Sequence, residues 1–257
     1  MHATATTLAR RTGTAPRASL RLGALAATAA FDLWRYRIWA AVHGESTARA
    51  VGVLQGWSRA ACRRLRLDVV VDGTPADAPR VYVANHRSYL DIPVLASVLG
   101  VGFMSRADVA GWPIVGGAAR AVGCVFVERD DPGGRVRAAR ALVRRLALGS
   151  VVVFPEGTTG GERLPGPFHE GLFRLLHRLG APVVPVTLRY GDRRAYWTDD
   201  VGLARHLRTR VLAADGIATA VHVGAPLEPG AYAGGPALAA AAHAAVGRPI
   251  EELGELA

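Results

Sequence analysis

The chain contains 257 residues, which allows one large domain or one domain with a small appendage and excludes a multidomain array. Half of the residues are hydrophobic and 20% are charged, which excludes a disordered or collagen-like chain. All 31 cationic side chains are arginine and the net charge is +10, so we expect an anionic partner such as nucleic acid, anionic lipid or a phosphorylated substrate.

The N-terminal region is expected to form two amphipathic helices. No uninterrupted apolar run reaches the roughly 18 residues that a membrane-spanning helix needs, and residues 22–31 resemble an export signal only faintly. Across residues 31–43, apolar side chains recur at steps of three and four between arginines, namely Phe31, Trp34, Ile38 and Val42. This pattern is typical of a helix at a membrane surface, or of one packed on a domain core. A second helix is predicted over residues 46–65.

Residues 67–257 predict one α/β domain, preceded by a tail and membrane-associating helices in residues 1–66. Short β-branched runs alternate with stretches of helical length, which indicates a mixed, largely parallel sheet flanked by helices. The predicted strands span residues 67–71, 81–84, 101–104, 124–128, 151–154, 183–188 and 218–223. The predicted helices span residues 92–99, 108–121, 134–148, 168–179 and 201–209, with a last helix from residue 236.

Polar, titratable and glycine-rich residues follow three of the predicted strands, in residues 85–91, 128–129 and 155–161. Ligands of open α/β sheets bind beyond the carboxyl ends of the strands. The sequence therefore predicts that the functional site gathers at these three segments.

His86 and Asp91 are the candidates for a general base and the carboxylate that orients it. On an ideal helix, five positions correspond to about 500° of rotation and to different faces, so a turn must bring the two side chains together. Asp91 would then orient the imidazole and stabilise its cation. Two alternatives stay open: Asp91 as a plain N-cap and His86 as a hydrogen-bonded structural histidine.

The sequence disfavours a covalent nucleophile. It has no Gly-x-Ser-x-Gly elbow, and neither Cys62 nor Cys124 lies near a histidine in sequence, although Ser88 beside His86 keeps a serine mechanism open. A base without a protein nucleophile deprotonates a substrate hydroxyl or water. The two distant cysteines also argue against a disulfide scaffold and a zinc site, so we expect reduced, buried thiols and no metal.

Arg106 and Arg129 follow or end predicted strands, so each is a candidate to contact a phosphate, with a solvated surface arginine as the alternative. In residues 154–159, proline and glycine shape a turn whose backbone amides can hold an anion or an oxyanion. A generic turn after a strand would use the same residue types.

Four segments of the α/β region stand in a characteristic order: Asn85-His86-x4-Asp91, Val125-Phe126-Val127-Glu128-Arg129, Phe154-Pro155-Glu156-Gly157-Thr158 and Val184-Pro185-Val186. In this order they resemble the 1-acylglycerol-3-phosphate acyltransferase family of the glycerolipid acyltransferase superfamily. The similarity spans about residues 67–225, and the first and third segments together are highly specific.

This resemblance implies acyl transfer from acyl-CoA or acyl-carrier protein to the free hydroxyl of a lysophospholipid, with no acyl-enzyme and no cofactor. His86 would take the hydroxyl proton, Asp91 would orient His86, and turn amides near Gly157 would hold the oxyanion. Arg106 lies in the stretch that precedes the second segment. The family's positions for the acceptor's glycerol phosphate correspond to Arg129, Glu156, Gly157 and Thr158.

Two departures concern the acceptor pocket. Thr159 stands where members that form phosphatidic acid commonly have arginine, and the basic residue of the second segment is either Arg106 or lost at Ala107. We expect 1-acylglycerol-3-phosphate as the acceptor, with a lyso-ornithine lipid or another lysolipid as the alternative. The alternative outside the enzymes is a basic membrane-binding protein without catalytic activity.

The expected location is the cytoplasmic face of the cell membrane, as a peripheral or monotopic protein. The expected partners are the lysophospholipid acceptor, acyl-CoA or acyl-carrier protein as donor, and an anionic membrane surface. Nucleic acid is not expected, because the sequence shows no nucleic-acid motif and no dense arginine tract with interleaved aromatic residues in the α/β region.

Overall fold

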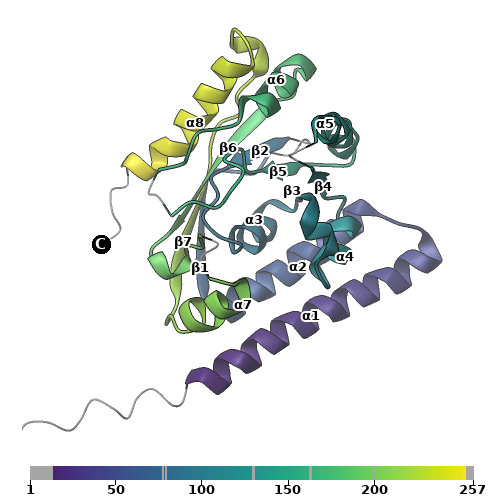
Figure 1. Ribbon diagram of the computed structural model, residues 1–257, viewed down its shortest axis with the longest axis vertical. Helices are drawn as coiled ribbons and strands as arrows, with labels where there is room; N and C mark the ends of the chain where they lie inside the picture. The colour runs from purple at the N-terminus through teal and green to yellow at the C-terminus, as the bar shows by residue number, and fades with distance from the viewer. Residues whose placement is uncertain are drawn as a thin grey trace, which may run out of the picture.

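A seven-stranded sheet with helices on both faces forms the middle of the protein (Figure 1). The computed structural model describes residues 14–252, apart from residues 77, 79, 129, 130, 162, 163, 199 and 200. All seven predicted strands are present: β1 (Leu67–Asp72), β2 (Val81–Ala84), β3 (Gly102–Arg106), β4 (Val125–Val127), β5 (Val151–Val153), β6 (Val183–Tyr190) and β7 (Ile217–Val223).

The strand order β1-β7-β6-β2-β5-β3-β4 places β2 at the centre of the sheet. Every pair of neighbouring strands is parallel except β6 and β7, so β2 to β6 share one carboxyl edge. This confirms the predicted mixed, largely parallel sheet. β3 pairs with β5 only at Gly102 and Phe103 and then pairs with β4 from Met104, so β3 and β5 diverge toward this edge.

The central strands are buried on both faces, which is why they read as continuous β-branched runs. In β2, Val81 and Val83 pack on one face and Tyr82 and Ala84 on the other. The first face is covered by α5 (Pro132–Leu146), α6 (Glu170–Leu179) and α8 (Gly235–Glu252). The second face is covered by α2 (Thr47–Leu65) and α3 (Asp91–Leu99), with the turns around α7 (Leu203–His206) at its end.

The predicted N-terminal helices are present as α1 (Thr14–His43), which forms one continuous helix, and α2. α1 lies outside α2 and buries Leu25 and Tyr36 (Figure 1). On its other side, α1 leaves five large apolar side chains between 49% and 75% exposed: Leu20, Phe31, Trp34, Ile38 and Val42. We call these residues the exposed stripe. The helix thus packs on the domain core through Leu25 and Tyr36, as one alternative predicted, whereas the exposed stripe faces away from it.

α2 begins after Ser46, whose Oγ accepts the Arg49 N–H as an N-cap. It contributes Ala61, Cys62 and Leu65 to the core beneath the sheet. No helix in the described part of the chain is both long enough and apolar enough to cross a bilayer. The domain boundary that we expect between residues 66 and 67 stays a prediction.

The helix predicted over residues 108–121 is wrong as a single element. The chain forms a 3-10 turn η1 (Ala107–Gly111), then a non-helical stretch, then α4 (Val115–Ala121). Pro113 disfavours helical backbone at the residue before it, and Ile114 adopts φ +62°, which a helix does not tolerate. The remaining differences are smaller: the helix predicted from residue 168 begins at Glu170, and α7 continues into a π-helical turn η3 (Leu207–Val211). Short 3-10 turns also occur at η2 (Arg193–Ala195) and η4 (Pro229–Ala231).

Candidate active site

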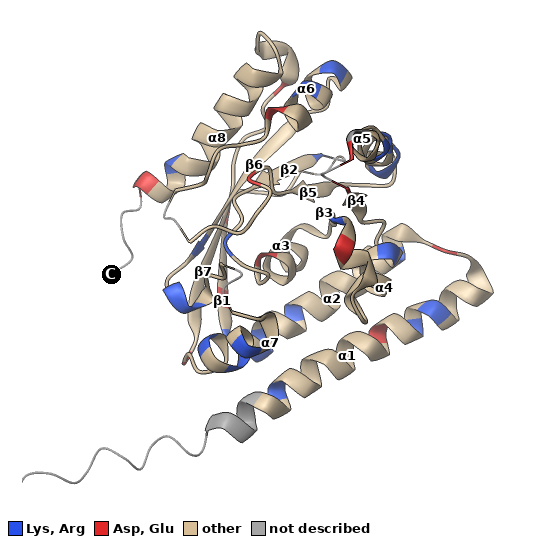
Figure 2. Ribbon diagram, viewed as in Figure 1, with Lys and Arg blue, Asp and Glu red and all other residues tan. Residues whose placement is uncertain are grey.

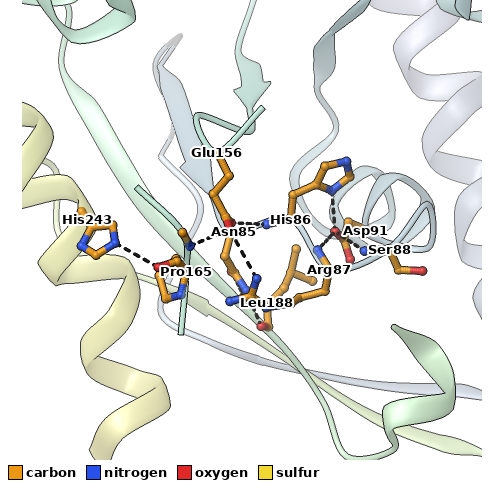
Figure 3. A network of polar contacts seen from close by, with 10 residues as sticks. Asn85, His86, Arg87, Ser88, Asp91, Glu156, Pro165, Leu188 and His243 are labelled. Carbon is orange, nitrogen blue, oxygen red and sulfur yellow. Dashed lines mark hydrogen bonds and ion pairs between the residues drawn. The ribbon is translucent and has the colours of Figure 1, made fainter. Parts of the chain in front are cut away.

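The loop after β2 carries the predicted base and its orienting carboxylate. Residues 85–90 connect β2 to α3, and Asp91 is the first residue of α3. His86 Nδ1 lies 2.7 Å from Asp91 Oδ2, with Asp91 fully buried and the His86 side chain 20% exposed (Figure 3). Leu90 occupies the N-cap position without a side-chain cap. The Asp91 carboxylate therefore does not act as a plain N-cap.

Both oxygens of the Asp91 carboxylate are held in place. Oδ2 also accepts the backbone N–H groups of Arg87 at 2.7 Å and Ser88 at 3.0 Å. Oδ1 accepts the Tyr190 hydroxyl at 2.7 Å. Burial, together with the Asp91 charge, raises the pKa of Tyr190 well above its ordinary value, so the phenol stays a neutral donor. A carboxylate fixed at both oxygens fixes the imidazole that it contacts.

Tyr190 is a residue that sequence reasoning missed. It lies 99 positions from Asp91 in the chain and ends β6, two residues beyond the predicted strand 183–188. The signal that could have found it is an aromatic hydroxyl at the carboxyl end of a strand adjacent to β2.

The His86 ring stacks on Phe154, the residue that follows β5, with ring centroids 4.0 Å apart and planes 16° apart. Because Nδ1 bonds a carboxylate, it carries the ring proton, and Nε2 is left with the lone pair. Nε2 has no hydrogen-bond partner among the described residues. The ring is thus fixed on two sides, with its basic nitrogen open to a substrate.

Ser88 is fully buried, and its hydroxyl has no hydrogen-bond partner in the part of the chain that the structure describes. A serine nucleophile needs access to the substrate and a base that takes its proton. This placement argues against the covalent serine mechanism.

Asn85 anchors the loop to the neighbouring strand. Its side-chain amide donates to the Leu188 carbonyl at 2.9 Å and accepts the Leu188 N–H at 2.7 Å, so it continues the pairing of β2 with β6 beyond Ala84. Asn85 is fully buried, and both of its polar atoms are used in this way. It therefore positions His86 rather than contacting a substrate.

Glu156 joins the His86 loop to the loop that follows β5. Its side chain is only 5% exposed and accepts the His86 N–H at 2.7 Å, the Gly166 N–H at 2.8 Å and the Arg87 Nη1 group at 3.4 Å (Figure 3). The Gly160 N–H donates back to the His86 carbonyl at 2.9 Å. The structure places Glu156 beneath the loops, and its predicted contact with the acceptor stays a prediction.

The turn after β5 is shaped by Gly157, whose φ of +78° favours glycine. The Gly157 N–H donates to the Phe154 carbonyl at 3.1 Å, so this amide closes the turn. Thr158 is exposed and Thr159 is half-buried. Oxyanion donors from this turn would therefore have to be amides other than that of Gly157.

Of the two predicted phosphate contacts, the structure describes only Arg106, which lies toward the β3–β4 side of the same edge. Arg106 ends β3 and is exposed, with its guanidinium paired to both oxygens of Asp108 at 3.0 and 3.3 Å. β2 and β3 are separated only by β5, which puts the two strands about 10 Å apart where they pair with it. Because β3 diverges from β5 beyond Phe103, Arg106 lies farther than this from the His86 loop. Arg129 lies outside the described residues, two positions beyond Val127, which pairs with Arg106.

Comparison with known proteins agrees with this geometry. Residues 66–189 match the family described as Acyltransferase. A lyso-ornithine lipid O-acyltransferase of Rhodobacter capsulatus is 35% identical over 194 residues, 71% of this chain and 70% of that protein. A protein of the same name from Pseudomonas aeruginosa is 33% identical over 157 residues, 59% of this chain and 60% of that protein.

A chloroplast 1-acyl-sn-glycerol-3-phosphate acyltransferase of Brassica napus is 36% identical over 139 residues, 53% of this chain and 40% of that protein. The matched region thus spans less than two thirds of the Pseudomonas and Brassica proteins. The crystal structure of the 1-acyl-sn-glycerophosphate acyltransferase PlsC from Thermotoga maritima has a TM-score of 0.67 at 23% identity, covers 93% of this chain and 95% of that one, and shows the same fold. With its segments, its sheet and these relatives in agreement, the chain belongs to the acyltransferase family that includes the lysolipid O-acyltransferases.

Proposed function

We propose that this protein transfers a fatty acyl group from acyl-CoA or acyl-carrier protein to the free hydroxyl of a lysophospholipid. His86 is the general base, Asp91 orients it, and no acyl-enzyme forms. The observation that carries the proposal is the His86–Asp91 pair, held rigid on three sides with Nε2 unengaged by the described residues.

The reaction that this geometry supports is direct transfer. The acceptor hydroxyl donates to His86 Nε2, which takes the proton as the oxygen attacks the thioester carbonyl. Asp91, 2.7 Å from Nδ1, stabilises the imidazolium that forms. When the tetrahedral oxyanion collapses, the carbon–sulfur bond breaks, and the imidazolium returns its proton to the departing thiolate. The products are the acylated lipid and a free thiol.

We propose 1-acylglycerol-3-phosphate as the acceptor, giving phosphatidic acid. The net charge of +10 and the arginines at the carboxyl edge suit a phosphate monoester. Lyso-ornithine lipid is the second candidate acceptor. Its headgroup is an amino acid and not a phosphate, so its binding would not need a phosphate-binding arginine. Two observations favour it: Thr159 stands where an arginine is common, and the Arg106 guanidinium is already paired with Asp108.

We further propose that the exposed stripe of α1 rests on the membrane surface that supplies the lipids. A helix whose apolar side chains are exposed in the described structure is suited to the boundary between headgroups and acyl chains. Arginines are spread over α1, α2, α5 and α7, so the attraction to anionic lipid is distributed over the protein (Figure 2). The cytoplasmic leaflet is the surface that we expect.

The test is an acyl-transfer assay with the purified full chain in vesicles. Labelled acyl-CoA or acyl-carrier protein is supplied with lysophosphatidic acid, lyso-ornithine lipid or other lysolipids, and wild type is compared with His86→Ala. The matched control is His222→Ala, because His222 Nδ1 lies 2.7 Å from Asp72 Oδ2 in a second, surface-exposed pair. We expect His86→Ala to lower the rate by about 10² to 10⁴, and His222→Ala to leave it within about two-fold of wild type.

Three other results are informative. Product from lyso-ornithine lipid alone would move the acceptor to that lipid and keep the mechanism. Equal activity of wild type and His86→Ala would contradict the assignment of the base. The absence of product from every acceptor would contradict the acyltransferase and favour a silent membrane-binding protein.

A further inference from the structure

A groove of about 350 Å³ is lined by residues of α1, of α4 and of the segment that leads into α4. Its α1 wall includes Trp34 and Arg37, and its other wall includes Trp112, Ile114 and Arg120. Neither His86 nor any residue of the two loops around it lines this groove. A volume of this size fits a small ligand or a lipid headgroup.

The groove opens among exposed apolar side chains of α1 and of the stretch before α4. Trp34 belongs both to the groove and to the exposed stripe of α1. On the opposite wall, Trp112, Ile114 and Val115 are also exposed, in the stretch where Ile114 adopts φ +62°. A β-branched residue rarely adopts this backbone conformation, and here it presents an apolar side chain beside α1. The stripe and this stretch thus form one apolar rim around the groove.

Inside this rim the groove is positively charged. Arg37 and Arg120 line it, and no acidic side chain is among its lining residues in the described structure. Arg120 Nη1 donates to the Ala110 carbonyl, which leaves the rest of its guanidinium for other contacts. Within the described ranges, neither arginine forms an ion pair.

Gly117 of α4 makes room for the Arg37 guanidinium. A Cβ atom at this position would lie 3.1 Å from Arg37 Nη2 and 3.1 Å from Leu33 Cδ2. Glycine therefore allows Arg37 to lie against α4 instead of extending freely from α1. The guanidinium is placed at the wall of the groove before any ligand arrives.

We propose that this groove binds the phosphate headgroup of an anionic membrane phospholipid that is not the substrate. Arg37 and Arg120 face the phosphate, and the two tryptophans flank it at the depth where indole rings prefer to lie in a bilayer. The acyl chains of the lipid continue along the apolar rim. The inference deepens the proposed function, because it rests on contact between α1 and the membrane, and it adds a defined lipid site to that contact.

The experiment is vesicle flotation of the full chain with phosphatidylcholine alone and with added phosphatidylglycerol, which is not a lysolipid acceptor. Arg37→Gln is compared with Arg35→Gln, which removes the same charge from an exposed position of α1 outside the groove. A surface arginine is worth about a five-fold change in binding to anionic membrane. We expect Arg35→Gln to lose no more than that, and Arg37→Gln to lose more than about ten-fold, because it gives up charge-assisted hydrogen bonds.

A second pair of variants leaves the charge unchanged. Gly117→Leu fills the groove, whereas Gly52→Leu places the same side chain on α2, where nothing lies within 4 Å of the new Cβ. We expect Gly117→Leu to lose the preference for phosphatidylglycerol and Gly52→Leu to keep it. All four variants should retain acyl transfer in detergent micelles, which shows that they are folded and separates this site from catalysis.

Two results would overturn the proposal. One is an equal loss for Arg37→Gln and Arg35→Gln, which would indicate diffuse surface attraction. The other is equal flotation with and without phosphatidylglycerol. If the wild type floats with neither vesicle, then the membrane contact of α1 fails as well, whereas His86-dependent activity in micelles would still support the acyltransferase.

Discussion

Replacing Tyr190 with phenylalanine removes one hydroxyl from beneath the proposed His86–Asp91 base pair and leaves the ring packing intact. The lost bond is 2.7 Å long, fully buried, and made to the charged Asp91 carboxylate. Hydrogen bonds to charged groups are worth about 1.5–3 kcal/mol, so we expect the free energy of unfolding to fall by about 2 kcal/mol. For a chain of this size, that is a decrease of about 4–8 °C in Tm.

The same change should slow the reaction without weakening acceptor binding. The remaining three donors to Asp91 all bind Oδ2, so Oδ1 loses the one hydrogen bond that it accepts within the described residues, and the carboxylate can turn away from His86. We expect kcat to fall about ten-fold, with KM for the lysolipid within about two-fold of wild type, because Tyr190 is buried below the base. Thermal unfolding and steady-state acyl transfer measure the two effects.

Tyr196→Phe is the matched control. The ring centroids of Tyr196 and Tyr190 lie 6.3 Å apart, but no hydrogen bond joins the Tyr196 hydroxyl to Asp91 in the part of the chain described. The reasoning is refuted if Tyr190→Phe matches wild type in both measurements, or if Tyr196→Phe slows the enzyme equally. A loss of stability with unchanged kcat would show that Tyr190 supports the fold and does not position the base.

Three further changes test other parts of the site. Glu156→Gln removes the negative charge beside the buried Arg87 guanidinium and should lower the free energy of unfolding by about 3 kcal/mol, measured in urea, with a matching loss of activity. Arg106→Gln should raise KM for lysophosphatidic acid about ten-fold while changing stability by less than about 0.5 kcal/mol, and an unchanged KM would exclude the phosphate contact. Burial raises the pKa of Cys124 from 9.0 to about 12, so above 9.0 the unfolded chain loses that proton first and the free energy of unfolding falls as pH rises. At about pH 10 this loss is about 1.4 kcal/mol, and Cys124→Ala should abolish it in urea titrations.

The strands could be predicted because their signal is local. Each central strand is buried on both faces, so a run such as Val151–Val153 is apolar throughout, and turn residues lie close by on both sides, Gly149-Ser150 before it and Pro155 after Phe154. The single helix predicted over residues 108–121 does not form, because the backbone leaves the helical conformation at Ile114. The periodicity of side chains does not encode the φ of Ile114, which depends on how the stretch after Pro113 turns toward α4.

The candidate site also has one part that the sequence predicts and one part that it does not. His86 and Asp91 are close in sequence, and the strand-to-helix turn between them was sufficient to bring them together. The side chain that binds the second oxygen of Asp91 is Tyr190, which lies on β6. It reaches Asp91 because β6 pairs with β2, and this pairing depends on how the whole sheet is assembled. The predicted contact of Glu156 with the acceptor stays a prediction, whereas its bonds to the His86 N–H of the β2 loop and to the Gly166 N–H ten residues further along its own loop are recognisable only once these segments are in place.

The order of the strands separates part of the expected headgroup site from the base along the edge of the sheet. The residues that hold His86 come from β6, β2 and β5, which are consecutive in the sheet. Of the expected headgroup contacts, Glu156, Gly157 and Thr158 also follow β5, whereas Arg106 ends β3 and Arg129 comes after β4 in the sequence. Since β3 leaves β5 after Phe103, substitutions near these two arginines need not be transmitted to His86 through a shared ladder. We therefore expect substitutions in the segment from β3 to α5 to change the preference for one lysolipid over another with little effect on the contacts between His86 and Asp91.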